Sequence, residues 1–126
     1  MQIRVYYEDT DMGGVVYHSN YLNFCERARS EAFFQRGFTP VLENGHFVVK
    51  KIAANYIASA KLGDMLEVNT QILSTKAASF TMLQTIYREE EKIFEMELLL
   101  AYVSFEGKAQ RLDAKTLDLL KSFYAV

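Results

Sequence analysis

Residues 7–21 combine aspartates, adjacent glycines and a histidine immediately before the strongest helical pattern of the chain. The first turn of a helix presents N–H groups without intrahelical partners and carries a partial positive charge. An acyl carbonyl whose oxygen points at those N–H groups would be polarised, and the oxyanion that forms on it would be stabilised. A carboxylate in the preceding loop could attack the carbonyl carbon or activate a water molecule. The arrangement is therefore suited to acyl transfer.

The same residues also suit structural roles, which the residue types alone favour. Asp9 and Asp11 are typical turn residues, and Ser19 or Asn20 is a suitable helix N-cap. The sequence contains no Gly-x-Ser-x-Gly motif, no Walker loop and no Cys/His metal set, so we expect no metal and no cofactor. Cys25 falls on the apolar side of the helical pattern, where packing is favoured over a nucleophilic role.

The elements that must position these groups follow from the hydrophobic periodicity. A helix is predicted from about Ser19 to Arg36. Gly37 is placed for a left-handed residue after the helix, with Phe38 opposite Phe33, as in a Schellman motif. The apolar stripe of the helix consists of Tyr21, Phe24, Cys25, Ala28, Ala32 and Phe33.

Alternating patterns before and after this helix predict strands. They cover residues 2–7, 47–58, 65–73, 80–88 and 93–105, and a weak helix is predicted over 114–124. Short connections favour antiparallel neighbours, and a helix of roughly 27 Å could lie across strands of roughly 33 Å. We therefore expect an α+β fold, with one domain over residues 1–126. Because one helix covers only one face of a sheet, the second face or an open edge is expected to be buried in a homo-oligomer.

Composition excludes several classes of protein. Half of the 126 residues are hydrophobic and the formal net charge is −2, which indicates a globular domain without the basic stripe of a nucleic-acid-binding protein. The first eleven residues are polar and acidic, and no apolar run reaches the ~18 residues of a membrane span. We expect no signal peptide, no membrane span and a cytoplasmic location.

A long motif in residues 7–29 resembles a known enzyme family. It reads Tyr7-x-Asp9-Thr10-Asp11-x-x-Gly14-Val15-Val16-Tyr17-His18-Ser19-Asn20-Tyr21-Leu22, followed by Phe24 and Glu26-x-Ala28-Arg29. It closely resembles the signature of the 4-hydroxybenzoyl-CoA thioesterase-like hotdog family, and within it the YbgC-type acyl-CoA thioesterases associated with the Tol–Pal operon. Residues 47–51 and 62–68 also match, so the resemblance covers nearly the whole chain.

The resemblance implies a strongly curved antiparallel sheet wrapped around one long helix. It also implies protomers joined edge to edge as homodimers or homotetramers, with the active site between them. Asp11 matches the catalytic aspartate of the family, and the backbone N–H of His18 matches the amide that polarises the thioester carbonyl. Whether the aspartate acts as nucleophile or as general base is open.

Other residues are assigned to the site with alternatives beside them. The His18 imidazole could orient water or Asp11, or simply make a contact at the helix end. Tyr7 could hydrogen-bond Asp11, although packing on the core is the favoured role, and Asp9 is expected to shape the turn. Substrate contacts are expected from Gly14, Val16, Tyr17, Asn20, Lys50 and Lys76.

The chain departs from the family pattern in two respects. Another hotdog branch uses a helical glutamate, which Glu26 or Glu31 could supply, but the Asp-x-Asp loop favours the aspartate branch. Some members hold the CoA nucleotide with a basic cluster before the third long strand, where this chain has only Lys76. Lys50, Lys51 or Lys61 could supply the missing charge, or the acyl group could arrive on a carrier protein.

The leading hypothesis is an acyl-CoA thioesterase acting on a medium- to long-chain apolar acyl group, in a pocket lined by residues such as Phe24, Phe33 and Met96. A hotdog dehydratase or hydratase is a second hypothesis, against which the loop signature speaks. The third is a non-catalytic acyl-carrier or envelope-system binding module, which would leave Asp11 without a task.

Overall fold

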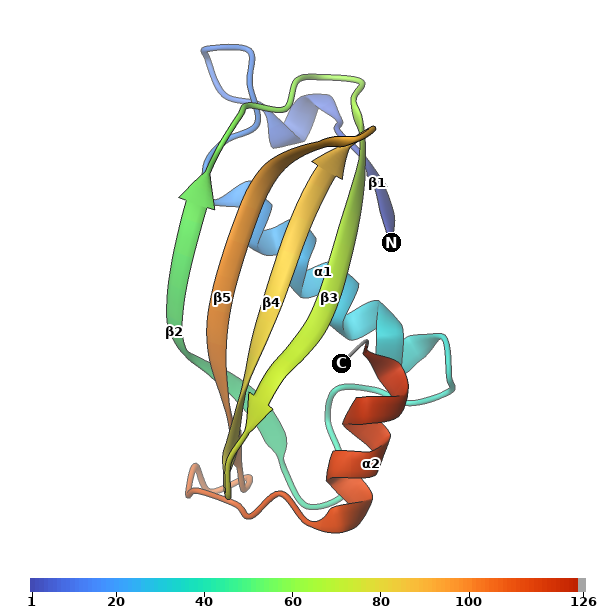
Figure 1. The fold of residues 1–126 in the computed structure, drawn as a ribbon, viewed down its shortest axis with the longest axis vertical. Helices are drawn as coiled ribbons and strands as arrows, with labels where there is room; N and C mark the ends of the chain where they lie inside the picture. Colours follow the sequence, from blue (N-terminus) through green and yellow to red (C-terminus); the bar gives the residue numbers. More distant parts are fainter. Residues whose placement is uncertain (125–126) are drawn as a thin grey trace.

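A computed structural model describes residues 1–124 and shows one curved sheet wrapped around one long helix (Figure 1). The five strands are all antiparallel to their neighbours, in the order β1-β3-β4-β5-β2. The elements are β1 Gln2–Arg4, the 3-10 helix η1 Tyr7–Asp9, α1 Asn20–Phe34, β2 His46–Tyr56, β3 Met65–Thr75, β4 Ser79–Arg88, β5 Glu91–Val103 and α2 Ala114–Phe123. The predicted architecture is confirmed.

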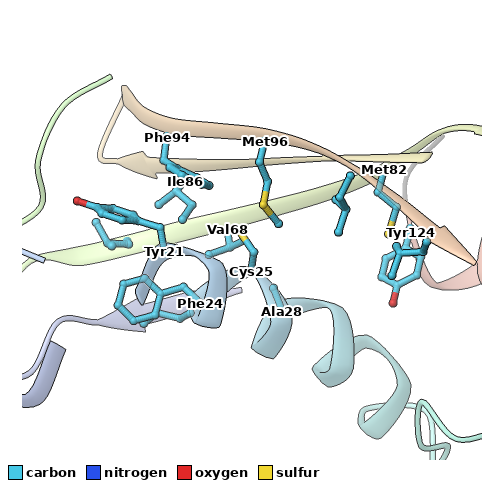
Figure 2. Close-up of a cluster of buried hydrophobic side chains, with 14 of the residues drawn as sticks. Tyr21, Phe24, Cys25, Ala28, Val68, Met82, Ile86, Phe94, Met96 and Tyr124 are labelled. Carbon is cyan, nitrogen blue, oxygen red and sulfur yellow. The ribbon is translucent and has the colours of Figure 1, made fainter. Parts of the chain in front are cut away.

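The core lies between α1 and the concave face of the sheet (Figure 2). Phe24 and Cys25 of α1 are fully buried against strand residues such as Phe94 and Met96. Burial of side chains of this size contributes ~1.5–3 kcal/mol each, so α1 is held mainly by this apolar contact. The full burial of Cys25 confirms its predicted place in the core, and this burial raises the pKa of the thiol to about 12.

The C-terminal end of α1 is closed by the predicted Schellman motif. The N–H of Phe38 donates to the carbonyl oxygen of Phe33 at 3.0 Å, and the N–H of Gly37 donates to that of Phe34 at 3.1 Å. Gly37 has a φ of 78°, which a residue without a side chain adopts at little cost. The ring of Phe123 in α2 packs edge-on against Phe33 with 4.8 Å between ring centroids, so this end is both hydrogen-bonded and covered.

A buried polar network fastens the middle of α1 to the sheet. The Gln84 side chain is fully buried, and its Nε2 donates to the Cys25 carbonyl oxygen at 2.9 Å and to Thr70 Oγ1 at 3.0 Å. Its Oε1 accepts a hydrogen bond of 2.9 Å from the Arg29 guanidinium, whose pKa is lowered by burial. Since an unpaired buried amide is costly, the network fixes how far along the sheet the helix sits.

The first strand is shorter than predicted. It ends at Arg4, because the chain turns into η1 three residues later. Exposed apolar side chains lie along the edge strand β2. Ile52 and Tyr56 of β2 pair with buried Leu98 and Phe94, so they lie on the helix-facing side, yet they are 40% and 49% exposed. The edge strand β2 therefore extends past α1 and leaves an apolar margin.

Candidate active site

Residues 10–16 form a small hairpin beside the connection between β2 and β3, at the top of Figure 1. The N–H of Asp11 donates to the Val15 carbonyl oxygen at 2.9 Å, and the N–H of Gly14 donates to that of Asp11 at 3.0 Å. Gly14 has a φ of 79°, a value that favours glycine. Val15 forms an antiparallel bridge with Lys61, which attaches the hairpin to the β2–β3 connection.

Asp9 joins the hairpin to the start of α1. The residue is buried, with 4% of its surface exposed; Oδ2 accepts from the Tyr6 N–H at 2.8 Å and Oδ1 from Asn20 Nδ2 at 3.1 Å. Its carbonyl oxygen accepts from the N–H of Tyr17 at 2.9 Å. The expected structural role of Asp9 is confirmed. Asn20, assigned to substrate from the sequence, uses its amide for this contact.

Asp11 is exposed at the base of the hairpin. Its Oδ1 accepts a 2.8 Å hydrogen bond from the Gly13 N–H, which is the turn contact expected of a loop aspartate. Among residues 1–124 its carboxylate has no hydrogen bond to His18 or Tyr7. Tyr7 is 82% exposed, so the expectation that it packs on the core is wrong. The single chain thus presents Asp11 to solvent and leaves one oxygen uncommitted.

The start of α1 has donors without acceptors. Within the described residues the backbone N–H groups of His18 and Ser19 find no hydrogen-bond acceptor. Ser19 occupies the N-cap position but makes no side-chain cap hydrogen bond. The N–H of Asn20 is taken by the Tyr17 carbonyl oxygen at 2.8 Å, so His18 and Ser19 carry the free N–H groups that lie directly before the helix. They lie where an acyl carbonyl could be polarised.

Aromatic side chains surround these donors. The His18 ring lies 4.5 Å from the Tyr17 ring and 6.5 Å from the Tyr56 ring, measured between centroids. The hydroxyl of Tyr56 donates to the His18 carbonyl oxygen at 2.9 Å. Tyr21 stacks on Phe94 and accepts from the Ala60 N–H at 3.0 Å, which ties the helix start to the β2–β3 connection.

Tyr56 was not predicted from the sequence as a site residue. The alternating pattern of strand 47–58 places its side chain on the helix-facing side of the sheet, but gives no sign of a contact with residue 18. Val16, which was assigned to substrate, is 3% exposed and its N–H donates to the Ala60 carbonyl oxygen at 2.9 Å. It therefore anchors the hairpin, whereas Gly14 and Tyr17 are exposed beside the site.

A groove of ≈190 Å³ lies between α1, α2 and the helix-facing side of the sheet, with β2 on one margin. Of the predicted pocket residues, Phe33 lines this groove, whereas Phe24 and Met96 are fully buried in the core and do not. The other lining residues are Glu26, Arg29, Ser30, Pro40, Phe47, Val49, Phe80, Met82, Leu100, Leu120 and Tyr124. Its walls are mainly apolar, with Glu26 and Arg29 as charged groups.

The lysines expected to bind the CoA nucleotide do not all lie in one place. Lys51 and Lys76 line one hollow of ≈330 Å³, to which Lys50 does not contribute. Lys51 pairs with Leu99, on the face of the sheet turned away from α1. Lys50 is the extra residue at an irregularity of the β2–β5 ladder. The structure therefore brings Lys76 together with Lys51, not with Lys50.

Residues 13–95 match the family model described as Thioesterase superfamily. The chain belongs to this superfamily. It is 51% identical over 87 residues to a Helicobacter pylori protein named acyl-CoA thioesterase YbgC, a match that spans 69% of this chain and 65% of that relative. The chain thus spans just under two thirds of that relative's length. It is 44% identical to the acyl-CoA thioester hydrolase YbgC of Escherichia coli O6:H1 over 80% of this chain and 78% of the relative.

The fold agrees with solved structures. A probable thioesterase from Bartonella henselae aligns with a TM-score of 0.84 and 35% sequence identity, over 90% of this chain and 97% of that one. The hotdog fold and the YbgC-type resemblance predicted from the sequence are confirmed. Within residues 1–124, no helix is long and apolar enough to cross a membrane.

Proposed function

We propose that this protein is an acyl-CoA thioesterase that hydrolyses an acyl thioester to a free acid and CoA. One observation carries the proposal: an exposed aspartate, Asp11, lies on the hairpin that leads into two unpartnered N–H groups at the start of a helix. The printed names of the relatives, acyl-CoA thioesterase and acyl-CoA thioester hydrolase, support the same activity.

In the proposed reaction the thioester carbonyl oxygen accepts hydrogen bonds from the N–H groups of His18 and Ser19. Asp11 either removes a proton from a water molecule that attacks the carbonyl carbon, or attacks that carbon itself and forms an anhydride that water then opens. In both routes the carbon–sulfur bond breaks, and the departing thiolate takes up a proton from the water that is consumed. The net reaction consumes one water and releases one carboxylic acid and one thiol.

We infer that the working unit is a homodimer or homotetramer, with β2 at the contact between protomers. The support is the apolar margin of β2, where Val49, Ile52 and Tyr56, with Ile57 directly after the strand, are each at least 40% exposed. His18 is exposed beside this margin and Asp11 is exposed on the hairpin that leads to it, so a second protomer would enclose the site and exclude water. A monomer in light scattering at micromolar concentration would contradict this part of the proposal.

The acyl chain is proposed to lie in the groove between α1 and the margin formed by β2. Its walls include Phe33, Phe47, Val49 and Leu100, which suit an aliphatic chain. Each additional buried methylene contributes about 0.8 kcal/mol, or nearly fourfold in binding, so kcat/KM should rise with chain length until the groove is full. Faster cleavage of propionyl-CoA than of octanoyl-CoA or dodecanoyl-CoA would contradict the apolar groove without contradicting the role of Asp11.

Release of free thiol from a panel of acyl-CoAs tests the proposed activity most broadly. The panel contains saturated chains, 4-hydroxybenzoyl-CoA and an acyl group on an acyl carrier protein. Thiol release from the CoA thioesters supports the proposal, and release from the carrier protein alone would change the substrate class. Hydration or dehydration of the acyl chain without thiol release, or binding without turnover, would contradict it. We also propose a cytoplasmic location, which cell fractionation would test.

A further inference from the structure

Tyr56 contacts the peptide group that joins His18 to Ser19, the two residues whose N–H groups are the proposed donors. Its hydroxyl donates at 2.9 Å to the carbonyl oxygen of His18, although the two residues are 38 positions apart in the sequence. That carbonyl belongs to the same peptide unit as the N–H of Ser19, which has no acceptor within residues 1–124. The contact thus joins the last residue of β2 to the start of α1 at the proposed site.

The planar peptide makes this contact directional. In a trans peptide the C=O of one residue and the N–H of the next point in opposite directions within one plane. A donor that holds the His18 carbonyl oxygen therefore also fixes the direction of the Ser19 N–H. Hydrogen bonds linked through one peptide polarise one another, so the bond from Tyr56 strengthens the N–H as a donor.

The Tyr56 side chain is itself held in place. Its ring packs edge-on against Phe94 at 5.1 Å and against Tyr21 at 5.6 Å, measured between centroids. Partial burial raises the pKa of Tyr56, and the neighbouring Tyr21 and Cys25 add to the effect. The hydroxyl accordingly keeps its proton at neutral pH and remains a donor. Ser19 offers no competing cap, since its side chain makes no N-cap hydrogen bond.

We propose that Tyr56 is a positioning residue for thioester hydrolysis, which holds the His18–Ser19 peptide so that the Ser19 N–H serves as a second donor to the oxyanion beside the His18 N–H. This inference rests on the proposed function. Tyr56 acts through the backbone and touches neither the thioester nor the attacking group. Its effect belongs to the transition state, where the negative charge on oxygen is largest.

The test compares Tyr56→Phe with the wild type, measuring thiol release from octanoyl-CoA and thermal unfolding on the same preparations. Phenylalanine keeps the ring contacts and removes only the hydroxyl. We expect kcat to fall roughly tenfold with KM little changed, less than the ~10²–10³-fold that follows loss of an oxyanion donor itself. Tyr87→Phe, on the half-buried outer side of β4, is the matched control and should keep the wild-type kcat.

A second substitution separates positioning from mere support of the fold. Incorporation of 3-fluorotyrosine at position 56 alone gives a more acidic phenol with nearly the same shape. The inference requires kcat at or above that of the wild type, with KM and the unfolding temperature unchanged. A wild type that cleaves thioesters, together with an unchanged kcat in Tyr56→Phe, would overturn the inference alone. A wild type that releases no thiol would overturn the proposed function and this inference with it.

Discussion

The two ends of α1 are built in opposite ways. At the C-terminal end, the N–H groups of Gly37 and Phe38 pair with the carbonyl oxygens of Phe34 and Phe33, and α2 covers the last turn. At the N-terminal end, the N–H groups of His18 and Ser19 have no acceptor within residues 1–124, and the expected cap by the Ser19 side chain is not made.

This difference separates stability from chemistry within one helix. A capped N-terminus typically stabilises a helix by about 0.5–2 kcal/mol, which this chain forgoes at Ser19. The position of α1 is instead secured by the buried Gln84 network and by the Schellman end. The exposed end can therefore keep its N–H groups free for a ligand without loss of the fold. Substitutions at the two ends should then affect different quantities.

The largest effect is expected for Asp11→Asn. The substitution removes the proposed acid–base or nucleophilic group from an exposed loop while keeping an acceptor for the Gly13 N–H. We expect kcat to fall by about 10²–10⁴-fold, with the unfolding temperature nearly unchanged. Glu8→Gln, an exposed carboxylate in the preceding turn, is the control and should retain activity. A kcat near that of the wild type in Asp11→Asn would remove the aspartate from the mechanism.

The next largest effect is on stability, in Gln84→Leu. The substitution leaves the Arg29 guanidinium and the Cys25 carbonyl oxygen without their partner in the core. Loss of partners for buried polar groups costs about 1–3 kcal/mol each, so the free energy of unfolding should fall by at least that amount. Chemical denaturation measures it, with Gln71→Leu on the exposed side of β3 as the control. A stability equal to that of the control variant would show that the network does not hold α1.

A smaller loss is expected for Gly37→Ala at the closed end of the helix. Gly37 has a φ of 78°, which costs a residue with a side chain roughly 1–2 kcal/mol. The unfolding temperature should drop while kcat stays that of the wild type, because residue 37 lies at the end of α1 away from the donors. Gly37→Asn should recover part of the stability, since asparagine tolerates this conformation. A lower kcat in Gly37→Ala, with a stability equal to that of the wild type, would show that the two ends of α1 do not act independently.

The smallest expected effect is a pH dependence of stability, which arises at Asp64 in the connection between β2 and β3. Burial alone would raise the pKa of Asp64, but hydrogen bonds from the Lys61 N–H and the Arg88 guanidinium lower it below its ordinary value of 3.8. A carboxyl group whose pKa is lower in the folded state contributes stability at higher pH. That contribution is lost as the pH falls below about 4 and through the folded-state pKa.

Thermal unfolding of the wild type and Asp64→Asn between pH 3 and pH 7 measures this contribution. The wild type should unfold at a higher temperature at neutral pH, and the difference should shrink as the pH is lowered through the window of about 4 and below. A difference that is constant with pH would show that the Asp64 charge does not hold the β2–β3 connection.

Local patterns predicted most of the fold. The apolar stripe predicted α1, and Gly37 with Phe38 predicted how it ends, because these signals lie within a few residues of one another. The 3-10 turn at residues 7–9 was missed because Asp9 folds back onto the Tyr6 N–H, a contact that interrupts the alternating pattern of the strand.

The candidate site was predicted less completely. Asp11 and the His18 N–H came from a motif continuous in sequence, whereas the contact of Tyr56 joins residues 38 positions apart. The contact between Gln84 and Cys25 spans 59 positions and depends on how the sheet curves over α1. Such pairs are set by tertiary packing, which periodicity does not encode.

In the proposed mechanism the open end of α1 polarises a thioester carbonyl through the N–H groups of His18 and Ser19. The most direct measurement is the infrared carbonyl stretch of carbonyl-¹³C-labelled octanoyl-CoA bound to Asp11→Asn, in which turnover is slowed. The account predicts a band at lower frequency than that of the free thioester in water, because two directed donors lengthen the carbonyl bond. A bound thioester that absorbs at the same frequency as in water, or higher, would contradict it.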